Sequence, residues 1–128
     1  MIFIDTNYFL RFLLNDVFDQ HREAKKLFSL GATGKAELFS SVIVFFEVYW
    51  VLTSFYEKKK TELLLILKNL LKMTFIKWEN GDILEKALRI YQKNAIDLED
   101  SYNLVYAQVN KAKSFKTFDK KLMKMAGK

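Results

Sequence analysis

Short apolar runs alternate with longer segments of helical periodicity, and this alternation constrains the fold of the chain most strongly. Strands are predicted at residues 2–5, 36–41, 74–78 and 114–118. Helices are predicted at residues 7–14, 19–31, 41–56, 61–72, 80–94, 98–113 and 119–127. Strands that alternate with helices form parallel sheets, because the chain must cross back over the sheet between them. We therefore expect an α/β fold, a three-layer α/β/α sandwich with a central parallel sheet of about four to five strands.

The first strand and the composition suggest one well-packed domain. The continuous apolar run "IFI" is typical of a central strand that is covered on both faces. Half of the 128 residues are hydrophobic (51%), so a single domain spanning residues 1–128 can bury a core. The absence of cysteine excludes disulfides and thiolate metal ligands.

No stretch of the sequence has the features of a membrane segment. A spanning helix needs about 20 apolar residues, and Glu47 interrupts the longest apolar stretch. The first residues carry no basic leader of the kind that begins a secretory signal. We expect a soluble protein of the cytoplasm.

The net charge of +6 favours polyanionic partners such as RNA or DNA. A lysine-rich surface that only keeps the protein soluble explains the same charge equally well.

Four acids fall where a parallel sheet collects its ligands, beyond the carboxyl ends of the strands. Asp5 ends the first strand, Glu47 lies about two turns into the helix after the second strand, Asp100 opens a helix, and Asp119 follows the last strand. Taken singly, Asp100 and Asp119 are typical helix caps. Glu47 has apolar neighbours on every side, so we expect it to be buried, either in an ion pair or on a metal. Asn7 is available to cap the next helix, so Asp5 would be free for a role other than capping.

Taken together, the four acids indicate a metal site. Carboxylates brought close to one another repel and shift one another's pKa values, unless a divalent cation neutralises them. Oxygen ligands select hard ions, so we expect Mg²⁺ or Mn²⁺, as one or two ions. Such ions activate water for attack on phosphate esters.

Four segments in this order resemble the PIN-domain ribonucleases, and more narrowly the VapC-type toxins of toxin–antitoxin systems: "IDTN", "SSVIVFFEVYWVL", "DLEDSYNLVYA" and "KTFDKKL". The resemblance extends from residue 2 to about residue 125. It implies that the metal-binding and catalytic residues are Asp5, Glu47, Asp100 and Asp119.

The resemblance also implies a set of residues that orient the metal ligands: Thr6, Asn7 and Thr117. Asp97, three residues before Asp100, is a rival for the same ligand position, or else a supporting group or a cap. We prefer Asp100, because helical spacing to Leu104 and Ala107 places it on a packed helix.

The expected activity is metal-dependent cleavage of RNA phosphodiester bonds. Single strands or exposed loops are the expected substrate, since duplexes shield their bases and backbone. Lysines near the end of the chain are candidates for phosphate contacts, namely Lys116, Lys120 and Lys121. The resemblance implies growth arrest by cutting an essential RNA, inhibition by a small antitoxin protein, and a homodimer. His21, the only histidine, is expected at the surface without a role.

Two other functions remain open at this stage. A catalytically silent PIN fold that binds RNA or protein would be favoured if an acid were missing, and all four are present. An aspartyl-phosphate enzyme or receiver domain would place further acids after the first strand, where Asn7 stands, and an Asp at the end of strand 74–78, where there is none.

Overall fold

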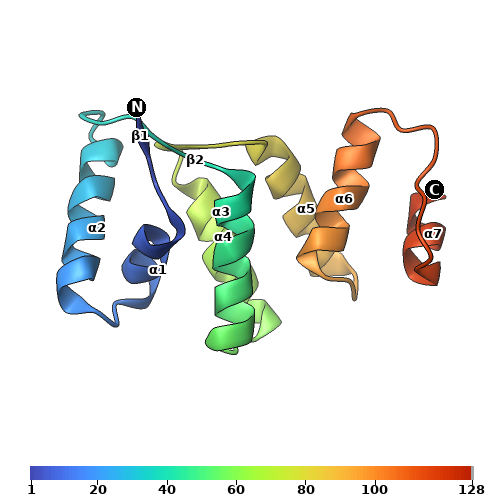
Figure 1. The fold of residues 1–128 in the computed structure, drawn as a ribbon, viewed down its shortest axis with the longest axis horizontal. Coiled ribbons are helices and arrows are strands. Elements are labelled where there is room, and N and C mark those ends of the chain that lie inside the picture. The colour runs from blue at the N-terminus through green and yellow to red at the C-terminus, as the bar shows by residue number, and fades with distance from the viewer. Residues whose placement is uncertain (128) are drawn as a thin grey trace. The chain divides into compact units, whose positions relative to one another are not determined.

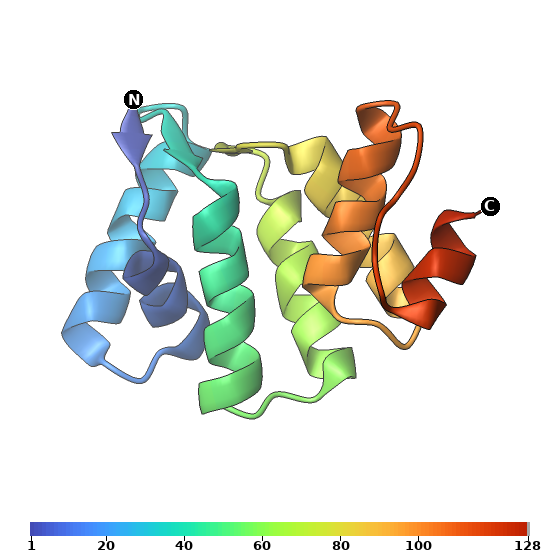
Figure 2. The same ribbon diagram turned by 45° about the vertical axis from the view of Figure 1, so that its right-hand side comes forward.

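The computed structural model describes residues 1–127, which form two compact units. Unit 1 is Met1–Gly81, and unit 2 is Asp82–Lys128, described up to residue 127. Each unit is described by itself below (Figures 1 and 2). The single domain expected for residues 1–128 stays a prediction.

The fold is α/β, as predicted, with a parallel sheet of three strands among the described residues. In chain order the elements are β1 (Ile2–Phe3), α1 (Thr6–Leu14), α2 (Phe18–Ala32), β2 (Leu38–Ser40), α3 (Val42–Trp50), the π-helical segment η1 (Val51–Phe55), α4 (Lys60–Lys72), β3 (Ile76–Trp78), α5 (Gly81–Lys93), α6 (Leu98–Val109) and α7 (Lys120–Ala126).

The sheet belongs to unit 1 and has the order β1-β2-β3 with parallel pairing. Ile2 lies opposite Leu38, which in turn lies opposite Ile76. β1 is therefore an edge strand with exposed side chains at Ile2 and Phe3, where a central strand was expected. An apolar run that is this short does not distinguish an edge strand from a central one.

The strand expected at residues 114–118 is irregular chain in the structure. This segment belongs to unit 2, where the described residues contain no strand. A strand needs a neighbour to supply its backbone hydrogen bonds, so a β-like pattern alone does not produce one. The expected four or five strands are accordingly three.

Helix α1 packs on α2 and α3 in unit 1, and aromatic rings fill the space below them. The ring of Phe9 stacks on Trp78 with centroids 4.9 Å apart, and Phe45 meets the same indole edge-on at 5.3 Å. Gly31 lies inside α2 because a Cβ there would come within 2.6 Å of the Leu38 side chain. Helix α2 is thus held tightly against the strand β2.

The predicted helix at residues 41–56 forms as α3 followed directly by η1. Ser41 caps α3 by accepting a hydrogen bond from the Val44 amide at 3.2 Å. One face of α3 is open to solvent, since Ile43, Glu47 and Trp50 are exposed. The predicted burial of Glu47 is wrong, because residues spaced by about one turn share a face even when most of their neighbours are apolar.

Unit 2 consists of α5, α6 and α7, and α6 contacts α7. Its buried side chains include Leu84, Leu88, Leu98, Val105 and Leu122. Within residues 1–127, no helix is both long and apolar enough to cross a membrane.

Candidate active site

Asp5 stands at the junction between β1 and α1 and caps the helix. Its Oδ1 accepts a hydrogen bond from the Thr6 amide at 2.8 Å, and its backbone is extended. The expectation that Asn7 would cap this helix is wrong, because Asn7 lies inside α1 with its side chain exposed. Asp5 therefore has one structural role, while its side chain remains exposed to solvent.

A buried hydrogen bond fixes the backbone directly before Asp5. The Ser40 hydroxyl, at the end of β2, donates to the Ile4 carbonyl at 2.7 Å, and Ser40 is only 2% exposed. This bond joins the carboxyl ends of two neighbouring strands at the candidate site. Sequence reasoning missed Ser40, although its place at the end of a predicted strand is the signal that selected Asp5.

Thr6 carries a polar atom that lacks a partner. Its Oγ1 is buried, and it makes no hydrogen bond to any of the residues that the structure describes. A buried hydroxyl usually has a partner, which is often ordered water. A water molecule or a hydrated cation beside Asp5 would supply such a partner, and the orienting role expected for Thr6 stays a prediction.

Glu47 projects from the exposed face of α3. A second acid, Glu79, follows β3 and was not among the predicted site residues. Its Oε1 accepts from the Val42 amide at 3.1 Å, and its own amide donates to the Ser40 carbonyl at 3.0 Å. Glu79 thus holds the start of α3 beside the end of β2. Its position directly after a predicted strand is the same signal that selected Asp5.

Asp97 and Asp100 lie together at the start of α6. Asp97 is the N-cap, and its Oδ1 accepts from the Asp100 amide at 2.8 Å. Burial raises the pKa of the Asp100 carboxyl, and the Asp97 side chain, Asp119 and Glu99 raise it further. Asp97 has the capping role that was one of its three interpretations, and the acids of this unit act on one another through their charges.

Asp119 caps α7, with its Oδ1 accepting from the Leu122 amide at 3.0 Å. The Thr117 hydroxyl accepts from the Asp119 amide at 3.1 Å. Thr117 thus holds the backbone of Asp119, and its role in orienting a metal ligand stays a prediction. Both contacts leave the Asp119 side chain exposed.

The candidate RNA-binding lysines are all exposed: Lys116, Lys120 and Lys121. The Lys121 ammonium donates to the Ala95 carbonyl at 3.3 Å, so part of its hydrogen-bonding capacity is used within unit 2.

The structure places Asp5 and Glu47 in unit 1, and Asp97, Asp100 and Asp119 in unit 2. Among residues 1–127, no three side chains of His, Cys, Asp or Glu form a group that could hold a metal ion. The site formed by four carboxylates stays a prediction. The donor set nevertheless fits a hard cation, because every candidate ligand is a carboxylate oxygen.

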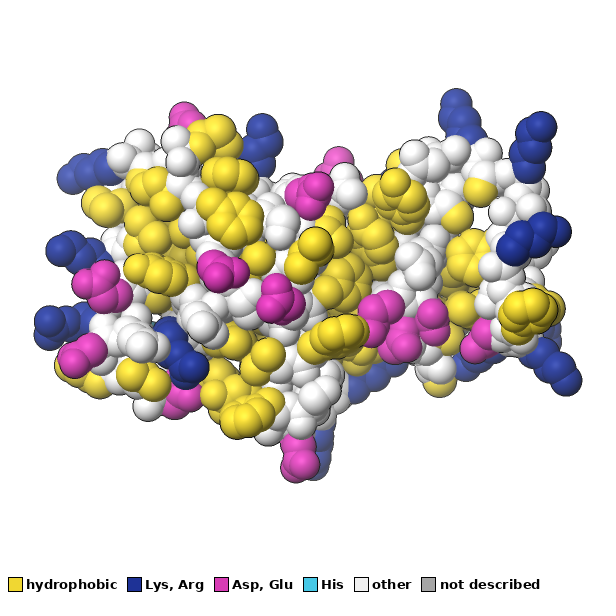
Figure 3. Space-filling view, viewed as in Figure 1, with side chains coloured by type: hydrophobic (Ala, Val, Ile, Leu, Met, Phe, Trp, Pro, Cys, Tyr) yellow, Lys and Arg dark blue, Asp and Glu magenta, His cyan; other side chains and the backbone are white. Residues whose placement is uncertain are grey.

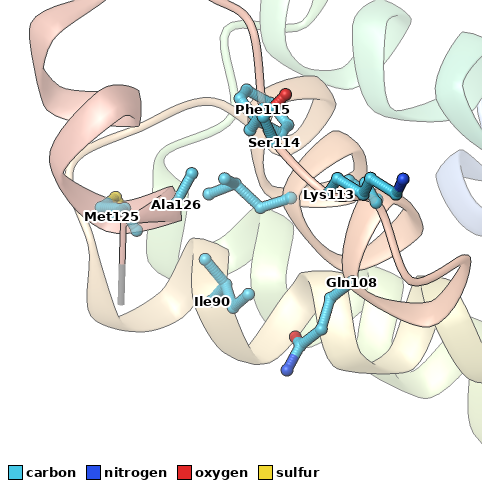
Figure 4. Close-up of a pocket in the computed structure, with 10 residues that line it drawn as sticks. Ile90, Gln108, Lys113, Ser114, Phe115, Met125 and Ala126 are labelled. Carbon is cyan, nitrogen blue, oxygen red and sulfur yellow. The ribbon is translucent and has the colours of Figure 1, made fainter.

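Unit 2 also contains a cavity of about 400 Å³, shown in Figure 4. Ile90 of α5, Gln108 of α6 and Met125 of α7 line it, together with Lys113 and Phe115. Its lining mixes polar and apolar side chains, and none of the candidate acids is among them.

Comparison with known proteins agrees with the α/β class of the fold. The sequence profile described as the PIN domain matches residues 2–128. No curated protein and no solved structure matches the chain. Because the profile covers nearly the whole sequence, the chain belongs to the PIN domain family, whose members are generally metal-dependent nucleases and bind RNA.

Proposed function

We propose that the chain is an endoribonuclease that depends on a divalent metal ion, Mg²⁺ or Mn²⁺. The observation that carries the proposal is the PIN-domain match over residues 2–128, which includes every candidate acid. The metal ligands in this proposal are Asp5, Glu47, Asp100 and Asp119.

The acids in unit 2 support this proposal through their electrostatics. Burial and the charges of Asp97 and Asp119 raise the pKa of Asp100, so its ionised form is disfavoured in the protein alone. A cation would remove this cost, since it attracts the same carboxylates that repel one another. In this proposal, a cation held by Asp100 and Asp119 offsets the repulsion among the acids of unit 2.

The residues around the acids hold them in place. The Thr6 amide orients the Asp5 carboxylate, and the Thr117 hydroxyl holds the backbone of Asp119. When bound, the ion activates water and offsets the negative charge that develops on the phosphate oxygens. Exposed lysines of α7 contact the RNA backbone, which positions the strand without reading its sequence.

The biological setting is proposed from the family resemblance alone. The chain would act in the cytoplasm as the toxin of a VapBC-type pair, with a small antitoxin protein holding it inactive. Exposed apolar side chains such as Ile43, Trp50 and Phe55 offer surface for that partner or for a homodimer.

Cleavage of labelled single-stranded RNA tests the proposal. The purified protein is incubated with a mixed RNA pool in Mg²⁺, in Mn²⁺ and in EDTA, beside Asp5→Asn. Asparagine caps helices as well as aspartate does, so this variant keeps the start of α1 and removes only the charge. We expect metal-dependent cutting by the wild type and none by the variant.

Asp19→Asn is the matched control, because Asp19 is an exposed acid in the first turn of α2 and lies outside the candidate site. It should cut like the wild type. Cutting that survives both EDTA and Asp5→Asn would reject the metal mechanism. RNA binding without any cutting would instead favour the silent binding module.

A further inference from the structure

Phe118 is the most exposed large hydrophobic residue among those described. Its side chain is 100% exposed, whereas the other highly exposed phenylalanines have neighbours. Phe55 meets Tyr56 edge-on at 5.0 Å, and Phe18 lies under the Arg22 guanidinium at 5.8 Å. A single exposed apolar residue is ordinary in itself, but Phe118 is next to Asp119, a proposed metal ligand.

The backbone on both sides of Phe118 is held by hydrogen bonds. Thr117 accepts from the Asp119 amide across it, and Asp119 caps α7 through the Leu122 amide. The ring therefore projects from a fixed backbone into solvent, one residue away from a proposed metal ligand. The hydrogen bonds fix where the side chain leaves the backbone, and the whole ring is open to a flat partner.

Lysines are frequent on both sides of Phe118 in the sequence, and the acid Asp119 follows it directly. Figure 3 shows dark blue Lys and Arg side chains, together with hydrophobic and acidic ones, over the part of unit 2 where Figure 1 places α7. The exposed lysines near Phe118 in sequence are Lys113, Lys116, Lys120, Lys121 and Lys124. None of these five forms a salt bridge with a described residue, so their charges are available to phosphates.

We propose that Phe118 stacks on an unpaired RNA base beside the proposed metal site, while the neighbouring lysines contact the phosphates. Proteins that bind single strands combine basic surfaces with aromatic rings in this way. The inference rests on the proposed function and adds to it a residue that selects single-stranded substrate. A base inside a duplex is already stacked on its neighbours and cannot use the ring.

The sequence around Phe118 favours a base over an apolar protein surface. Its four nearest neighbours in the chain are polar: Lys116, Thr117, Asp119 and Lys120. Docking of a protein usually needs a contiguous apolar patch, whereas one ring is enough to stack on one base.

Binding of a fluorescein-labelled single-stranded RNA, measured by anisotropy in EDTA, tests this role apart from cleavage. The proteins compared are the wild type, Phe118→Ala, Phe118→Tyr and the control Phe18→Ala. We expect Phe118→Ala to weaken binding about ten-fold, which is the usual scale for one stacked base. Phe118→Tyr should restore binding, because it keeps the ring, and Phe18→Ala should bind like the wild type.

A duplex of the same sequence separates stacking from a general structural effect. Phe118→Ala should bind the duplex as the wild type does, and its salt dependence should be unchanged because no charge is removed. Equal affinity of Phe118→Ala and wild type for the single strand would overturn the inference. Equal losses of affinity for single strand and duplex in Phe118→Ala would also overturn it. A changed oligomeric state of Phe118→Ala with unaltered RNA binding would overturn it as well.

The same samples assayed with metal distinguish this inference from the proposed function. Cleavage by the wild type combined with unaltered RNA binding by Phe118→Ala would reject the stacking role and leave the nuclease standing. Weaker RNA binding by Phe118→Ala without any cleavage by the wild type would reject the nuclease proposal and support the stacking role of Phe118. A wild type that binds no RNA would overturn both.

Discussion

The two units of the molecule position their candidate acids in different ways. In unit 1, Asp5 follows a strand whose end is tied to β2 by the buried bond between Ser40 and Ile4. In unit 2, Asp97, Asp100 and Asp119 all lie at helix starts, with no strand among the described residues to anchor them. Burial raises the pKa of the Asp100 carboxyl, and the charges of its acidic neighbours raise it further.

This difference gives the acids of the two units different local properties. Asp5 in unit 1 follows a strand end that is held by a buried tertiary hydrogen bond, whereas the acids of unit 2 act on one another through their charges. A substitution in unit 1 should therefore act mainly through position and stability, and one in unit 2 mainly through charge. The following predictions test this distinction.

The largest expected effect is the loss of RNA cleavage in Asp5→Asn and in Asp100→Asn. Each should lower the cleavage rate by at least about 100-fold, since even residues that only support metal ligands are worth 10- to 100-fold. The double variant should be no slower than either single variant if both acids serve one site. Single-turnover cleavage of labelled RNA measures all three rates.

If the rate reductions of the two single variants multiply in the double variant, a shared site is contradicted, because residues of independent sites contribute independently to the activation free energy. Asp19→Asn, an exposed acid of α2, should leave the cleavage rate unchanged and controls for net charge.

The next largest effect is expected for Ser40→Ala, which should lower the free energy of unfolding. Removing the hydroxyl leaves the Ile4 carbonyl without its buried donor, which costs about 1–3 kcal/mol. Urea unfolding monitored by tryptophan fluorescence measures this loss. Ser29→Ala, an exposed serine of α2, should change stability little, and equal losses in the two variants would show that β1 does not depend on the Ser40 bond.

Features set by neighbouring residues could be predicted from the sequence. Asp119 caps its helix as expected, because a cap depends on residues within one turn. Three pairing strands and the parallel sheet were also predictable from the alternation of strands and helices.

Features set by distant residues could not be predicted. A strand at residues 114–118 requires a partner that local pattern does not supply, and Glu47 is exposed because α3 is covered on only part of its circumference. Asp5 was expected to be free of capping, but α1 begins at Thr6, so Asp5, with its extended backbone, is the cap. The Ser40 bond joins residues 36 positions apart, a separation that no helical or strand period reveals.

Stability of the metal-free protein should respond in opposite directions to the loss of an acid in the two units. Asp5→Ala removes the cap of α1 and should lower stability by about 1 kcal/mol. Asp100→Asn should raise the melting temperature in EDTA. The pKa of this carboxyl is above its ordinary value of 3.8, so its ionised form at neutral pH costs stability. Thermal unfolding in EDTA measures both, and a lower melting temperature for Asp100→Asn would contradict the repulsion in unit 2.

The smallest expected effect is a change in the stability of unit 1 at acid pH. It depends on the ion pair between Arg11 and Asp16, whose attraction contrasts with the repulsion between Asp100 and its neighbours. Arg11 lies 2.7 Å from Asp16, and the Tyr56 hydroxyl donates to the same carboxylate at 2.9 Å. These contacts, Arg11 first, lower the pKa of Asp16 below 3.8.

A carboxyl whose folded pKa is lowered stabilises the protein above its unfolded pKa, and this contribution disappears as the pH falls through the folded pKa. The stability difference between wild type and Asp16→Asn should therefore be constant near neutrality and shrink below pH 3.8. It should be small, because exposed ion pairs contribute little. Urea unfolding across this range measures it, with Asp19→Asn as the control. A difference that widens in acid would show that Asp16 is not held by Arg11, and the contrast between the two units would then rest on Asp100 alone.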